Sequence, residues 1–125
     1  MSPQVPAPQK GLRRVVSAFH NSLAGFISVW REPAFRQETV LAVVLLPASF
    51  WVGQSWLETA MLCTLVVLVL VTEILNTAIE AVVDRIGPEW NTYSKAAKDL
   101  GSAAVLLCLL LCSSVWAWAL WERLA

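Results

Sequence analysis

Apolar residues recur every three or four positions along the first regular segment of the chain, from Leu12 through Phe19 to Trp30, with polar residues between them. This period predicts an amphipathic helix over residues 12–31, whose apolar face suits the interface of a membrane. Residues 1–11 are rich in Pro, Gln and Ser, and we expect them to be disordered.

Three long apolar stretches follow, and each predicts a transmembrane helix. Their expected bounds are about 34–52, 57–86 and 92–121, with Gly87-Pro88 ending the second. The chain is therefore expected to be an all-α membrane protein. It combines one N-terminal amphipathic surface helix with three transmembrane helices in a single domain over residues 12–125.

Charged and aromatic residues predict how these helices lie in the membrane. Lys and Arg gather before the first span and between the second and third, whereas the loop 53–58 has neither. The positive-inside rule then places the N-terminus and the second loop in the cytoplasm, with the C-terminus outside. Trp116, Trp118 and Trp121 suit an outer interfacial belt. The formal net charge is zero, so no nucleic acid partner is expected.

Three acids and an amide interrupt the second span: Glu73, Asn76, Glu80 and Asp84, which we call the acidic ladder. At about 100° per residue, they project within a sector of roughly 80° on one helix face. Ionisable groups at this depth are costly and usually mark a functional site. We expect the acidic ladder to run from lipid at Glu73 to cytoplasmic water at Asp84.

The predicted cytoplasmic side offers oxygen ligands for a metal ion. Glu32, Glu80 and Asp84 reach a similar level, and carboxylates of this kind suit Mg²⁺ when phosphate oxygens complete its shell. Nearby Lys and Arg side chains can hold phosphates. Glu73 lies deeper, where it suits a general base acting on a group presented at the membrane interface.

These residues by themselves fit more than one class of protein. An enzyme could join a lipid to a polar, metal-bound substrate, and a small ion- or proton-coupled transporter would use the same carboxylates. A structural assembly protein is a third reading. The sequence holds no P-loop GxxxxGK[ST], no protein-kinase glycine loop and no His-Asp-Ser set.

One long motif narrows this choice. The segment Glu73-Ile-Leu-Asn-Thr-Ala-Ile-Glu-Ala-Val-Val-Asp-Arg-Ile-Gly87 closely resembles the signature of the prokaryotic diacylglycerol kinase family. Ala34-Phe-Arg-Gln-Glu38 and Ala97-Lys-Asp-Leu-Gly-Ser-Ala-Ala-Val105 are further matches. The resemblance covers roughly residues 12–122, with the same order of one surface helix and three spans.

The resemblance implies a lipid kinase of the bacterial inner membrane, assembled as a homotrimer with active sites between subunits. Such an enzyme moves the γ-phosphoryl group of ATP to the primary hydroxyl of diacylglycerol, giving phosphatidic acid. Mg²⁺ would accompany the ATP. Some relatives phosphorylate undecaprenol instead, and the motif alone does not decide between the two lipids.

The resemblance also implies a role for individual residues. Glu73 matches the general base and Asn76 the amide beside the reacting groups, while Glu32 and Glu80 match the carboxylates that hold magnesium on the nucleotide. The remaining matches fall on the nucleotide side and on the lipid side. The ATP-binding set is Arg14 (or Arg13), Glu32, Glu80, Asp84, Glu89, Lys98 and Asp99. The lipid-binding set is Ala34, Phe35, Arg36, Gln37, Glu38, Glu73 and Ser102.

Overall fold

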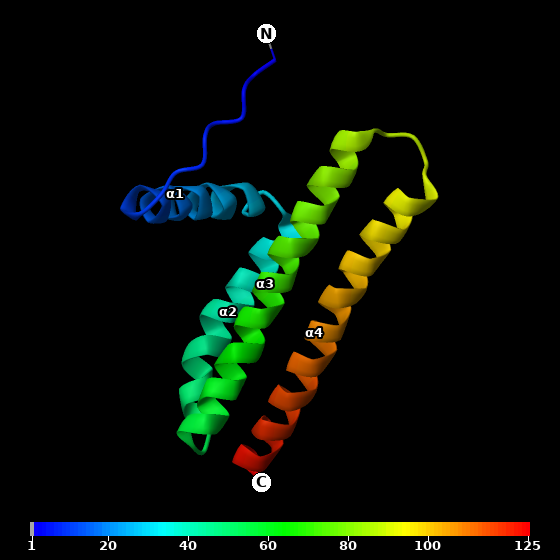
Figure 1. Ribbon diagram of the computed structural model, residues 1–125. Coiled ribbons are helices and arrows are strands. Elements are labelled where there is room, and N and C mark those ends of the chain that lie inside the picture. The colour runs from blue at the N-terminus through cyan, green and yellow to red at the C-terminus, as the bar shows by residue number, and fades with distance from the viewer. Residues whose placement is uncertain (1) are drawn as a thin grey trace.

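The computed structural model describes residues 2–125, which form four α-helices and no strand. These are α1 (Leu12–Val29), α2 (Pro33–Val52), α3 (Trp56–Ile86) and α4 (Thr92–Leu124) (Figure 1). Helix α1 ends two residues earlier than the period predicted, and α4 continues three residues beyond the predicted end. Residues 2–10 have no regular secondary structure, and the disorder predicted for Met1 lies outside the described residues.

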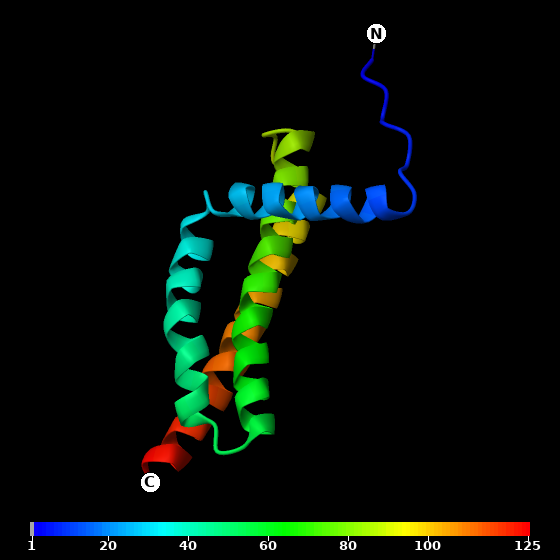
Figure 2. The same ribbon diagram turned by 90° about the vertical axis from the view of Figure 1, so that its left-hand side faces the viewer.

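Helix α3 is the central member of the bundle. It packs along α2 on one side and α4 on the other, whereas α2 and α4 scarcely touch each other (Figures 1 and 2). All three are long and apolar enough to cross a membrane. This confirms the predicted surface helix with three spans, and it places the acidic ladder on the helix that both neighbours cover.

Helix α1 lies across the bundle instead of along it (Figure 2). Its apolar side chains are exposed, among them Leu12, Phe19 and Ile27. The chain then turns sharply into α2, where the rings of Trp30 and Phe35 meet edge to face with centroids 6.4 Å apart. An exposed apolar face on a crosswise helix fits a position in the membrane interface.

The apolar core lies in the middle of the three long helices. It is formed by Ala42 of α2, by Leu65, Val66 and Val69 of α3, and by Cys112 of α4. Cys112 and Cys108 thus act as small apolar side chains, and all three cysteines are free thiols. Burial of apolar surface between these helices fixes the depth at which the acidic ladder meets α2 and α4.

One tryptophan of the predicted outer belt has a different position from the others. The indole Nε1 of Trp116 donates a hydrogen bond of 3.2 Å to the backbone oxygen of Leu62, so it ties α4 to α3. Trp118 and Trp121 are exposed, as an interfacial belt requires. The sequence could not separate the three because they lie close together near the same helix end.

Candidate functional site

Burial falls along the acidic ladder from its deep end to its outer end. Glu73 is 7% exposed and Asn76 is 9% exposed, whereas Glu80 is half-buried and Asp84 is exposed. This is the order predicted from helix geometry alone. The ladder therefore joins a dry position between packed helices to a position open to water.

Three other carboxylates, two from the first part of α2 and its N-cap and one from α3, lie within electrostatic range of Glu73. Glu80 and Glu32 both act on Glu73, and Glu73 acts on Glu38. The corner between α1 and α2 brings Glu32 here, at the N-cap of α2, where its side chain makes no capping bond. Like charges repel one another. A group of carboxylates this close together therefore favours the binding of a cation or a proton.

Three buried side-chain atoms in this region have no hydrogen-bond partner within residues 2–125: Glu38 Oε2, Asn76 Oδ1 and Thr77 Oγ1. Native proteins leave few buried polar atoms unpaired, so such a group calls for a functional explanation. The sequence pattern points to Glu38 and Asn76 as site residues but does not point to Thr77. Its position four residues after Glu73 and three before Glu80 is the pattern that could have found it.

Asn76 of α3 meets Gly101 of α4 at close range. A Cβ atom at Gly101 would collide with Oδ1 of Asn76, so only glycine admits this contact. A small cavity of about 230 Å³ lies beside it, lined mainly by apolar side chains of both helices. Ser102 follows Gly101 on α4 and is exposed, as a residue open to lipid must be.

The turn between α3 and α4 collects most of the predicted nucleotide-side residues. Asp84, Glu89, Lys98 and Asp99 all line one open pocket of about 520 Å³. Within it Lys98 Nζ donates to Asp84 Oδ1 over 2.7 Å, an ion pair that joins the end of α3 to the start of α4. Lys95 and Asp99 form a second pair at 2.5 Å on the α4 surface.

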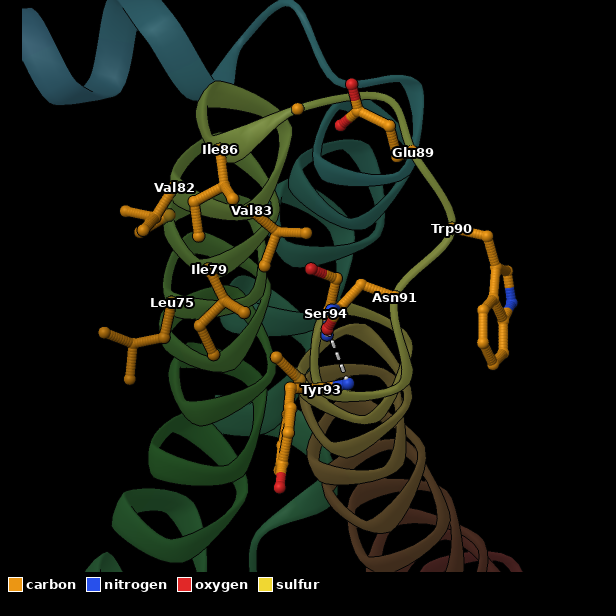
Figure 3. A pocket seen from close by; sticks show the side chains of 13 residues that line it. Leu75, Ile79, Val82, Val83, Ile86, Glu89, Trp90, Asn91, Tyr93 and Ser94 are labelled. Atoms are coloured by element: carbon orange, nitrogen blue, oxygen red, sulfur yellow. Dashed lines mark hydrogen bonds between the residues drawn. The ribbon is translucent and has the colours of Figure 1, made fainter.

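A larger, mostly apolar pocket of about 860 Å³ also borders this turn (Figure 3). Leu75, Ile79 and Val82 of α3 line one wall, and the Tyr93 side chain extends from the start of α4. Asn91 fixes this start, because its side-chain oxygen accepts hydrogen bonds from the backbone N–H groups of Tyr93 and Ser94.

The rest of the predicted set is spread more widely. Arg14 lies on exposed α1, away from the pocket at the α3–α4 turn. Of the first turn of α2, Ala34, Arg36 and Gln37 are exposed. Phe35 is instead buried at 6% exposure against Trp30, so it also holds the corner between α1 and α2.

Comparison with known proteins identifies the family. The pattern described as prokaryotic diacylglycerol kinase matches residues 20–120. The chain belongs to this family.

Several relatives are similar along almost their whole length. A diacylglycerol kinase of Pseudomonas aeruginosa is 45% identical over 118 residues, covering 94% of this chain and 96% of that protein. One from Escherichia coli K12 is 41% identical over 114 residues, covering 90% and 93%. One from Haemophilus influenzae is 41% identical over 107 residues, covering 85% and 91%. The resemblance stated from the motif is thus confirmed.

The carboxylates of this family member offer donors for magnesium but not a closed metal cage. Within the described chain, no group of three or more His, Cys, Asp and Glu side chains is placed to hold a metal ion. The ion pairs in residues 2–125 are Lys95–Asp99 and Lys98–Asp84, so Glu32 and Glu80 are not paired with cations. Mg²⁺ needs only one or two carboxylates when phosphates supply its other ligands, so this donor set fits it.

Proposed function

We propose that this chain is an ATP-dependent diacylglycerol kinase of the membrane. It transfers the γ-phosphoryl group of ATP to the primary hydroxyl of diacylglycerol, with phosphatidic acid and ADP as products. The family match over residues 20–120 carries this proposal. The buried Glu73 on a membrane-spanning helix supports it, because the hydroxyl of a lipid substrate lies within the membrane and needs a base there.

Glu73 is the proposed general base. The lipid oxygen attacks the γ-phosphorus and forms the new O–P bond, while the bond from that phosphorus to the bridging oxygen of ADP breaks. Glu73 takes the proton that the hydroxyl loses. Asn76 lies one turn further along the same face, where its side-chain amide can orient the reacting groups. Phosphoryl transfer depends mainly on such positioning and on charge neutralisation.

Glu32 and Glu80 are the proposed ligands for Mg²⁺ on the nucleotide. When bound, the metal would neutralise charge on the transferring phosphates. Asp84, Glu89, Lys98 and Asp99 border the pocket at the α3–α4 turn, and with Arg14 they form the proposed nucleotide side. Lys98 and Arg14 supply the positive charge that phosphates require.

The proposed lipid side draws on α2, α3 and α4. It comprises Glu73, Ser102 and the segment Ala34, Phe35, Arg36, Gln37 and Glu38. The exposure of Ala34, Arg36 and Gln37 leaves this turn open to a headgroup. Glu38 turns inward toward Glu73, so the segment extends from the surface to the proposed base.

We further infer a homotrimer in the bacterial inner membrane, with residues 12–125 as one kinase domain. Three spans are too few to enclose both substrates, and the proposed nucleotide residues of one chain lie at separate places. Active sites between subunits would bring them together. The uneven Lys and Arg placement supports a cytoplasmic N-terminus and α3–α4 turn, with the C-terminus outside.

The decisive experiment uses purified protein in lipid micelles with MgATP. Wild type should phosphorylate diacylglycerol, and Glu73→Gln should not. Undecaprenol is assayed as a second acceptor, and greater activity on it would reassign the lipid. Absence of phosphorylation of either lipid by well-folded protein would refute the kinase. Ion flux in sealed vesicles without ATP or lipid acceptor would then favour the transporter.

A further inference from the structure

Thr77 is half-buried beside the acidic ladder, and the proposed reaction gives its hydroxyl no role. Its Oγ1 is buried and has no partner within residues 2–125. Other hydroxyls on the long helices bond to their own backbone: Thr39 to Phe35 O at 2.8 Å, and Thr64 to Ala60 O at 2.7 Å. Thr77 makes no such bond, so its hydroxyl is left to donate elsewhere.

The direction of Thr77 follows from a second threonine on α3. Thr59 lies about five full helical turns earlier, so the two side chains share one helix face. Thr59 Oγ1 donates to the backbone oxygen of Ser49 in α2 over 3.4 Å. Thr77 therefore lies on the side of α3 that faces α2, where Glu32 and Glu38 also lie.

The lean of helical side chains indicates which carboxylate Thr77 can reach. Long side chains on a helix point back toward its N-terminus, over the residue three or four positions earlier. Glu80 thus leans over Thr77, whereas Glu73 leans away from it. Glu80 is half-buried and has no cationic partner in the described chain. A free donor and a free acceptor lie one turn apart.

We propose that Thr77 is a positioning residue: its hydroxyl, unpaired in this structure, donates a hydrogen bond to the Glu80 carboxylate once the metal and nucleotide are bound, and so aims Glu80 at the metal. This rests on the proposed function, in which Glu80 is a metal ligand. Ligating carboxylates need such a second bond, because it fixes their orientation and leaves the other oxygen toward the metal. This role involves a hydrogen bond alone, and no covalent bond is made or broken.

The test measures metal affinity without turnover. Mn²⁺ is titrated, with its electron spin resonance signal as readout, into full-length protein in micelles with a non-hydrolysable ATP analogue. Thr77→Val keeps the shape and removes the hydroxyl, and it should weaken Mn²⁺ binding by about tenfold. Thr77→Ser should restore it. Thr64→Val, on the exposed face of the same helix, is the matched control and should bind like wild type.

Several results would overturn the role of Thr77. Wild-type affinity in Thr77→Val, failure of Thr77→Ser to rescue, or an equal loss in Thr64→Val would each do so. A fall in kcat for diacylglycerol with unchanged metal affinity would assign the hydroxyl to Glu73 instead of Glu80. The kinase assay on wild type is separate, so an active wild type with an unaffected Thr77→Val variant rejects only this inference.

Discussion

At the residue scale, depth separates the tasks that we propose for Glu73 and Glu80. Glu73 is 7% exposed and Glu80 is half-buried, so the two carboxylates have different surroundings. They nevertheless lie on the same helix face, seven positions apart in the sequence. Glu73 can meet a group that comes from the lipid. Glu80 lies about 10 Å further along the helix axis, where a hydrated nucleotide can reach.

Amide substitutions should separate these two tasks. Glu73→Gln removes the proposed base, so kcat should fall by a factor of about 10² to 10⁴ while nucleotide binding is retained. Glu80→Gln removes a metal ligand, so Mg²⁺-nucleotide binding should weaken by about tenfold or more. Steady-state kinetics with calorimetric nucleotide titration measures both. Near-full activity in both variants would reject the site.

At the element scale, the fit of α4 against α3 sets the position of Asn76. Gly101 leaves no room for a side chain beside the Asn76 amide, which is itself buried and unpaired in the described chain. The amide is the mobile end of a side chain, so it can rotate away from a new methyl group. The contact thus governs orientation more than stability.

Gly101→Ala should therefore impair the reaction more than the fold. The added methyl group displaces the Asn76 amide, and we expect kcat to fall at least tenfold with little change in thermal stability. Gly25→Ala is the control, because nothing lies within 4 Å of a Cβ there. A wild-type kcat in Gly101→Ala would show that the amide position does not matter.

The outer halves of the same two helices are held by Trp116. Its hydrogen bond to the backbone oxygen of Leu62 is lost in Trp116→Phe, which should lower the free energy of unfolding by about 1 kcal/mol. Reversible denaturation in mixed micelles measures this. Trp118→Phe is the comparison, because Trp118 is exposed and bonds only to Glu122 of its own helix. Equal losses would remove the special role of Trp116.

At the scale of the whole molecule, one chain does not bring all the proposed site residues together. Glu32 and Glu80 lie within electrostatic range of Glu73, whereas Asp99 lines the pocket at the α3–α4 turn and Arg14 lies on α1. The exposed apolar side chains on the three spans leave ample surface for lipid or for further copies.

Mixing inactive subunits tests whether sites are shared. If active sites lie between subunits, Glu73→Gln and Asp99→Asn protein should each be inactive alone and should regain activity when unfolded together and refolded in micelles. Some mixed oligomers then contain one site with neither substitution. A mixture of Glu73→Gln with Glu73→Ala is the control and should stay inactive. Absence of recovery in the first mixture would place each site within one chain.

Helix periodicity made much of the site predictable without a structure. The spacing of Glu73, Asn76, Glu80 and Asp84 fixed their shared face, and the length of the apolar run before them fixed their order of depth. The sequence also distinguished the crosswise helix α1 from the three spans, because only α1 has one apolar face and one polar face along its whole length. These are local properties, set by residues within a few turns of one another.

Tertiary packing decided the rest. The sequence alone determined that this is a helical membrane protein with a ladder of carboxylates on its second span. It did not determine that Gly101 lies against Asn76, that Trp116 bonds to α3, or that the Thr77 hydroxyl is buried and unpaired in the described chain. Each depends on the rotation and separation of helices whose contacting residues are far apart in the chain. The helical period determines which residues lie on the same face of a helix. Packing determines which residues of other helices that face contacts.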